Sequence, residues 1–153
     1  DKQTDHYIMS RLEEAKQFRK TFGQEILPDI SRFGFIKTPL WKMQLNLIKE
    51  EASEFLVAAD EVYADPEKDR LRSELLKELS DLVFVCYQFA ATYNLDLDEA
   101  LRRVYESNMS KLDEQGKVIY REDGKVLKGE GYKEPNLNGL FPPSNTLYDT
   151  NGK

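Results

Sequence analysis

Cysteine and histidine are nearly absent from this sequence, and their scarcity excludes several kinds of site. The chain has 153 residues with one cysteine, Cys86, and one histidine, His6. A lone cysteine forms no intrachain disulfide, which favours a reducing compartment, and the apolar stretch LVFVCYQFA predicts a buried structural thiol. One histidine, expected on the surface of the first helix, cannot complete a structural zinc site or the Glu-x-x-His motifs of a di-iron bundle.

Long apolar runs and an excess of basic residues are also missing. No apolar run approaches the roughly 20 residues of a membrane span, and the opening DKQTDHYIMS lacks the features of a signal peptide. We therefore expect no membrane partner and a cytoplasmic location. The formal net charge of −6 argues against nucleic acid as a partner, because phosphate neutralisation needs a basic surface.

Apolar periodicity and helix breakers predict an all-α fold. We expect a helix over residues 5–22 capped by Thr4, and others over 39–64, 66–93 and 96–111. Pro39 suits a first helical position, Asp65 suits an N-cap, and DLDE at residues 96–99 has capping-box spacing. The later stretch KVIYREDGKVLKG has two β-prone runs around Asp-Gly, which predicts a small β-hairpin at about residues 117–128.

These elements predict one helical domain over residues 1–131, which is long enough for its own core. The following residues carry three prolines and several asparagines. They predict an extended or partly disordered tail over residues 132–153, which lies over its own subunit or a neighbouring one.

Two pairs of acidic residues lie on the apolar faces of the second and third expected helices. Glu51 lies three residues after Ile48 and therefore shares its face, and Glu54 follows one turn later. Glu78 and Asp81 occupy the same kind of face on the third helix. If the two helices pack together, four carboxylates converge.

Several carboxylates in a site of low dielectric require raised pKa values or bound cations. Hard oxygen ligands suit Mg²⁺, with Mn²⁺ as a substitute, so we interpret these acids as metal ligands. The alternative is that they lie on solvated helix faces and pair with Lys49, Lys77 or Arg72. Spacing alone leaves both interpretations open.

Three motifs together resemble the signature of the MazG-like all-α nucleoside triphosphate pyrophosphohydrolases. EEASE at residues 50–54 and ELSD at 78–81, with 23 residues between them, match the family's EExxE and ExxD elements. NMSK at residues 108–111 is similar to its downstream Asn-x-x-Lys element, and the resemblance covers residues 41–111. The stretch DGKVLKGEGYKEPNL resembles the C-terminal part of short standalone and phage-type members.

The resemblance implies a four-helix-type bundle that assembles as a dimer or tetramer. It implies hydrolysis of a nucleoside triphosphate to the monophosphate and pyrophosphate, with Mg²⁺ held by Glu51, Glu54, Glu78 and Asp81. Glu50 is then an additional catalytic acid that orients a ligand or the attacking water. The chemistry suits the residues, because phosphoryl transfer needs neutralised phosphate oxygens and a water held in line.

Positive partners for the phosphates are expected after the acidic motifs. By resemblance, Asn108 and Lys111 bind the substrate, and Arg121, Lys125 and Lys128 follow on the expected hairpin. Residues 102–133 hold eight Lys/Arg and six Asp/Glu, an excess of two in a chain of net charge −6. A solvated hairpin explains the last three cations equally well.

The base pocket is predicted from aromatic and amide side chains. Trp41 and Tyr132 offer stacking surfaces and Gln44 or Asn46 could contact base edges, although an isolated aromatic such as Trp41 is more often core. We predict a purine substrate, dGTP or GTP. One alternative is the same fold acting on dUTP, dCTP or phosphoribosyl-ATP. Another is a non-catalytic helical oligomerisation or regulatory module, against which the complete acid set argues.

Overall fold

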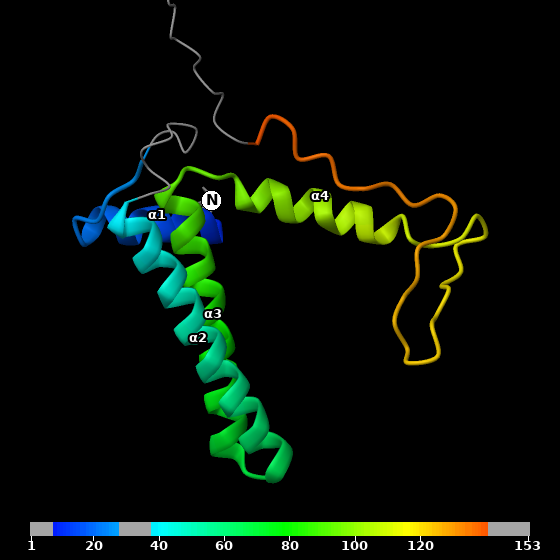
Figure 1. Cartoon of the computed structure of the whole chain (residues 1–153), viewed down its shortest axis with the longest axis horizontal. Coiled ribbons are helices and arrows are strands. Elements are labelled where there is room, and N and C mark those ends of the chain that lie inside the picture. The colour runs from blue at the N-terminus through cyan, green and yellow to red at the C-terminus, as the bar shows by residue number, and fades with distance from the viewer. Residues whose placement is uncertain (1–7, 28–37, 141–153) are drawn as a thin grey trace, which may run out of the picture. The chain divides into compact units, whose positions relative to one another are not determined.

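The chain forms four α-helices and no β-strand within residues 8–27 and 38–140, the part that the computed structural model describes. The helices are α1 (Arg11–Thr21), α2 (Pro39–Ala64), α3 (Asp69–Thr92) and α4 (Leu97–Met109), as Figure 1 shows. The all-α prediction is therefore confirmed. Helices α1–α3 belong to one compact unit, and a second unit begins at Asp96 and contains α4. The single-domain boundary and the four-helix bundle stay predictions.

Helix α1 begins later than predicted. Ser10 caps it, because Ser10 Oγ accepts from the Glu13 N–H at 3.2 Å and Glu13 Oε2 accepts from the Ser10 N–H at 2.9 Å. This reciprocal capping box leaves residues 8–10 outside the helix, so the start predicted at residue 5 is wrong. Thr4 and His6 lie outside the described residues.

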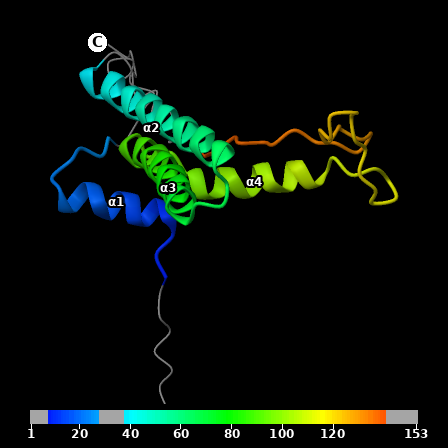
Figure 2. The same ribbon diagram turned by 90° about the horizontal axis from the view of Figure 1, so that it is seen from below.

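Helices α2 and α3 form an antiparallel hairpin, side by side in Figures 1 and 2. The bounds predicted for α2 are confirmed, with Thr38 as its N-cap and Pro39 at its first position. Helix α3 begins at Asp69, not at Pro66. Asp65 instead ends α2 by donating its N–H to the Glu61 carbonyl at 3.1 Å, and the turn that reverses the chain occupies the next residues.

The core lies where α1 and the start of α2 pack on the end of α3. Ala15, Ala91 and Tyr93 are almost completely buried there. Trp41 of α2 packs with its ring centroid 5.1 Å from those of Phe89 and Tyr93. This aromatic cluster joins α2 to α3 and fixes the base of the hairpin.

A buried polar network crosses the same core. Arg19 of α1 donates from Nε to the Glu25 carbonyl at 2.6 Å and from Nη1 to Gln88 Oε1 at 3.2 Å. Gln88 Nε2 in turn donates to the Ala15 carbonyl at 3.3 Å. The network ties α1 to α3, because each of these buried groups would otherwise lose its hydrogen bonds to water.

Cys86 is half-buried on α3, and burial raises the pKa of its thiol. This environment favours the predicted structural thiol over a nucleophile. No helix among the described residues is long and apolar enough to cross a membrane.

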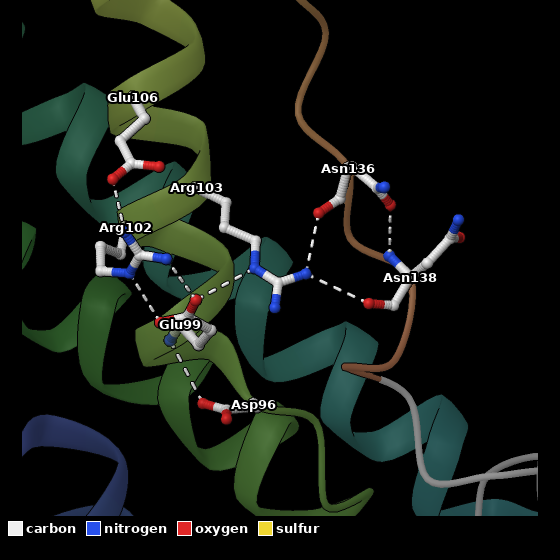
Figure 3. A network of polar contacts seen from close by, with 7 residues as sticks. All are labelled: Asp96, Glu99, Arg102, Arg103, Glu106, Asn136 and Asn138. Carbon is white, nitrogen blue, oxygen red and sulfur yellow. Dashed lines mark hydrogen bonds and ion pairs between the residues drawn. The ribbon is translucent and has the colours of Figure 1, made fainter.

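Helix α4 begins as predicted and ends two residues early, at Met109. Asp96 Oδ1 accepts from the Glu99 N–H at 3.2 Å. The Glu99 carboxylate pairs with Arg102 at 2.6 Å and with Arg103 at 3.0 Å (Figure 3), and these hydrogen bonds lower its pKa to about 2.

The structure does not support the predicted β-hairpin at residues 117–128 as a pair of regular strands. The chain reverses at Asp123-Gly124, where Gly124 has a φ of 86°, but the pairing is a single antiparallel bridge between Tyr120 and Val126. An isolated two-stranded pair is marginal in water, and the apolar side chains of this segment are largely exposed.

The segment after this turn runs back along α4 without regular structure over residues 132–137. Ser107 Oγ donates to the Lys133 carbonyl at 2.7 Å. Arg103 Nη1 donates to the carbonyls of Asn136 at 2.9 Å and Asn138 at 3.1 Å (Figure 3). The start of the predicted extended tail is thus fastened to α4, while residues 141–153 lie outside the described part.

Replacing Arg19 tests the buried network. We expect Arg19→Met to lower the free energy of unfolding by about 1–3 kcal/mol, because buried acceptors lose their donor while the volume is kept. Urea denaturation measures the change. Arg11→Met is the control, since Arg11 lies on the same helix in an exposed ion pair with Glu14 and should change stability little. Equal stabilities of the two variants would contradict the assigned role.

Candidate metal centre

Three carboxylates from two helices meet on the α2–α3 hairpin. Glu51 and Glu54 come from α2 and Glu78 comes from α3, and each offers an oxygen within 4.8 Å of the others. The i, i+3 spacing puts the first two on one helix face, and the antiparallel packing brings the third opposite them. The expected convergence is therefore present for three of the four acids.

The two inner carboxylates have oxygens without hydrogen bonds. Glu51 Oε2 and Glu78 Oε2 are buried and have no hydrogen-bond partner within residues 8–27 and 38–140. Glu54 is exposed. A buried carboxylate oxygen without a partner is costly, and a cation bound between these groups removes that cost.

The electrostatics of Glu51 agree with this geometry. Its pKa is raised, first by burial and then by the neighbouring charges of Glu54 and Asp81, a hydrogen bond with Glu54, and the charge of Glu78. Glu51 therefore loses its proton reluctantly unless positive charge is supplied. Hard carboxylate oxygens suit Mg²⁺ or Mn²⁺, so the donor set fits the predicted ion.

Asp81 lies outside this three-residue group. Its Oδ2 pairs with Lys77 Nζ at 2.8 Å, and Lys77 also lies 3.4 Å from Glu78 Oε1. These contacts raise the pKa of Lys77, with the hydrogen bond to Asp81 as the main cause. Pairing with a lysine, the alternative interpretation, therefore applies to Asp81 and to one oxygen of Glu78, although the charge of Asp81 still raises the pKa of Glu51.

Glu50 lies away from the three carboxylates. It is exposed and lines a shallow hollow on α2 with Lys42 and Asn46. Consecutive helical residues point about 100° apart, so Glu50 and Glu51 cannot share a face. A catalytic role for Glu50 has no support in this arrangement.

Two residues predicted for the base pocket are part of the core. Gln44 is 1% exposed and donates from Nε2 to Thr92 Oγ1 at 3.1 Å. Trp41, three residues earlier on the same face, packs on Phe89 and Tyr93. Stacking on a base and reading of its edges are thus not supported for either residue.

The other predicted substrate-binding residues belong to the second unit. Asn108 is exposed near the end of α4, and Lys111 is half-buried just beyond it. Arg121 pairs with Asp123 at 2.5 Å, and Lys128 Nζ lies 4.5 Å from the ring centroid of Tyr132. Lys125 is exposed at the turn.

The sequence pattern did not predict the contacts by which Arg103 and Ser107 of α4 hold the carbonyls of residues 133–138, which we call the Arg103 clamp. Arg103 contacts a carbonyl 33 residues away in sequence, and Ser107 contacts one 26 residues away. Both residues occupy ordinary helical positions, so no local pattern could have singled them out.

Comparison with known families decides how to interpret the acidic hairpin. Residues 15–108 match the family described as PRA-PH, phosphoribosyl-ATP pyrophosphohydrolase. The chain belongs to this family. The predicted resemblance is therefore confirmed, because the family is part of the MazG-like all-α nucleoside triphosphate pyrophosphohydrolases. A comparison with curated proteins found no match.

Membership implies a nucleotide pyrophosphohydrolase, a hydrolase acting on phosphoric anhydrides. Enzymes of this kind are generally dependent on divalent metal ions, and the three converging glutamates are a group that could hold one. The matched region includes all the predicted metal ligands but ends at Asn108, before Lys111 and the turn segment.

The raised pKa of Glu51 predicts an unusual pH dependence. The folded state holds this proton more tightly than the unfolded chain, so the metal-free protein loses stability as pH rises through the ordinary and then the raised pKa. In EDTA at pH 7, Glu51→Gln should therefore melt at a higher temperature than wild type. Mg²⁺ should stabilise wild type and have less effect on the variant.

Asp60→Asn is the control for this melting experiment, because Asp60 is an exposed acid on the same helix. It should leave both the melting temperature and the Mg²⁺ response near wild type. A lower melting temperature for Glu51→Gln in EDTA at pH 7 would contradict the account of a strained carboxylate cluster.

The Lys77 contact predicts competition with a metal ion. Lys77→Met should tighten Mg²⁺ binding several-fold in a calorimetric titration, because a cation next to Asp81 and Glu78 is removed. Arg70→Met is the control, since Arg70 pairs with Glu74 elsewhere on α3. Weaker binding by Lys77→Met would show that Lys77 supports the site instead.

Proposed function

We propose that this protein hydrolyses a purine nucleoside triphosphate, in the presence of Mg²⁺, to the monophosphate and pyrophosphate. The observation that carries the proposal is the convergence of Glu51, Glu54 and Glu78 on the α2–α3 hairpin. Water adds across the α–β phosphoric anhydride in this reaction. The family supports this reaction class, and the carboxylates supply the metal ligands that it needs.

The three glutamates would have different tasks. Glu51 and Glu78 would hold the ion through the buried oxygens that have no other partner. Glu54 is exposed, so one oxygen of its carboxylate would complete the ligand set from the solvent side while the other accepts a hydrogen bond from the attacking water. Asp81 would become a further ligand when it leaves Lys77. The bound ion would neutralise phosphate charge and lower the pKa of water.

The interpretation of the sequence favours dGTP and GTP as substrates. The family description favours phosphoribosyl-ATP as a second candidate. All three carry a triphosphate on a purine nucleoside, so the same carboxylate site could serve each. Asn108 and Lys111 would bind the phosphates, as the Asn-x-x-Lys resemblance implies.

We further propose that the active protein is a homo-oligomer. Large apolar side chains remain exposed on both helices of the hairpin, among them Leu56, Val57, Leu76, Val83 and Phe84. Exposed apolar surface of this extent is typical of an interface. Light scattering of the purified chain would show a dimer or tetramer, and a monomer at micromolar concentration would contradict the proposal.

A nucleotide panel tests the function. Wild type with Mg²⁺ should release pyrophosphate from a purine triphosphate, and EDTA should abolish the release. Glu54→Gln and Glu78→Gln should each reduce the rate by at least about 100-fold, because they keep the size but remove a ligand charge. Asp60→Asn should retain the wild-type rate.

The panel contains dGTP, GTP, dUTP, dCTP and phosphoribosyl-ATP. If only phosphoribosyl-ATP released pyrophosphate, phosphoribosyl-ATP would replace dGTP and GTP as the proposed substrate. No release from any nucleotide would overturn the proposal and favour the non-catalytic module.

A further inference from the structure

Gly129 lies unusually close to the backbone that follows α4. A Cβ atom at this position would lie 3.0 Å from the carbonyl oxygens of both Lys111 and Leu112. The Gly129 N–H donates to the Lys111 carbonyl at 3.0 Å. Gly129 has no positive φ, so a side chain at position 129 is disfavoured by the close approach alone, because the backbone of Lys111 and Leu112 would have to shift by a few tenths of an ångström.

The same contact fastens the residues that follow. The Tyr132 N–H donates to the Gly129 carbonyl at 3.2 Å and closes a turn. Lys133 then donates its N–H to Ser110 Oγ at 3.0 Å and accepts from Ser107 Oγ at 2.7 Å. Residues 129–133 therefore have a fixed place against the end of α4.

The cations of this unit differ in their availability. Its arginines are neutralised, since Arg102 and Arg103 pair with Glu99 and Arg121 pairs with Asp123. The lysines of this unit, in contrast, form no ion pair with any residue that the structure describes, and Lys111 and Lys128 are the two that border the hydrogen bond between Gly129 and Lys111. Lys128 directly precedes Gly129, and its ammonium group lies over the Tyr132 ring. Two unpaired lysines thus flank the Gly129 contact.

We propose that Gly129 is a positioning residue for polyphosphate binding. The absence of a side chain lets the turn close on α4, which holds the backbone of Lys128 next to that of Lys111. The side chains of these two lysines extend from adjacent backbone segments, so their ammonium groups would bind successive phosphates of one chain, each neutralising a different phosphate. The inference rests on the proposed function for the identity of its ligand, a nucleoside triphosphate.

Gly129→Ala and Gly131→Ala form a matched pair for the test. A Cβ atom at Gly131 would meet nothing within 4 Å, and Gly131 has no positive φ. The probe is inorganic tripolyphosphate, titrated calorimetrically into the full chain in EDTA. Gly129→Ala should weaken binding at least about fivefold, while Gly131→Ala should stay within about twofold of wild type. With Mg²⁺ and substrate, Gly129→Ala should raise KM more than it lowers kcat.

Lys128→Met separates positioning from a general folding defect. This variant should weaken tripolyphosphate binding by itself, and adding Gly129→Ala to it should cost much less than in wild type. If the losses of tripolyphosphate affinity from Lys128→Met and Gly129→Ala multiplied fully in the double variant, the proposal would be overturned. Wild-type affinity in Gly129→Ala, or no binding of tripolyphosphate by wild type, would also overturn it.

The experiments can contradict the proposed function and the positioning role of Gly129 independently of each other. Absence of pyrophosphate release from every nucleotide would end the proposed function and leave the tripolyphosphate result valid, because binding requires no turnover. Normal turnover with an unchanged KM and affinity in Gly129→Ala would end this inference alone.

Discussion

Repulsion among Glu51, Glu54 and Glu78 is the constraint on which the functional account depends. Packing of α2 against α3 brings an oxygen of each within 4.8 Å of the others, and one oxygen each of Glu51 and Glu78 lies buried without a hydrogen-bond partner among the described residues. The chain stabilises this arrangement from elsewhere, through the aromatic cluster around Trp41 and the buried Arg19–Gln88 contact at the base of the hairpin. A divalent cation bound there would convert the repulsion into attraction, so the proposed metal binding would stabilise the hairpin.

The two units carry different charged groups. In the hairpin three glutamates meet, and Lys77 pairs with Asp81, so one of the four predicted ligands already has a cation beside it. In the second unit the arginines are paired with acids, whereas Lys111 and Lys128 form no ion pair with any described residue. Under the proposed function, a metal ion held by the glutamates and the unpaired lysines are the two kinds of positive charge that would neutralise phosphate oxygens.

The sequence predicted those features of the fold that depend on residues close together in the chain, such as helix bounds and the residues that share a helix face. The bounds of α2 follow from Pro39 and from the apolar period, and the convergence of the acids follows from i, i+3 spacing on two apolar stripes. Where two signals compete, the prediction failed: Ser10 caps α1 with a full capping box, although Thr4 offered an earlier start. The β-prone runs around Gly124 lacked a surface to pack on. Long-range contacts such as the Arg103 clamp have no local signal at all.

The most direct test of the central claim is to locate the bound ion. Crystals of the full chain grown with Mn²⁺ would give an anomalous difference peak at each manganese position. The account predicts a peak between α2 and α3, in contact with the carboxylates of Glu51, Glu54 and Glu78. A well-ordered hairpin without a peak there, at saturating Mn²⁺, would contradict the assignment of these glutamates as metal ligands.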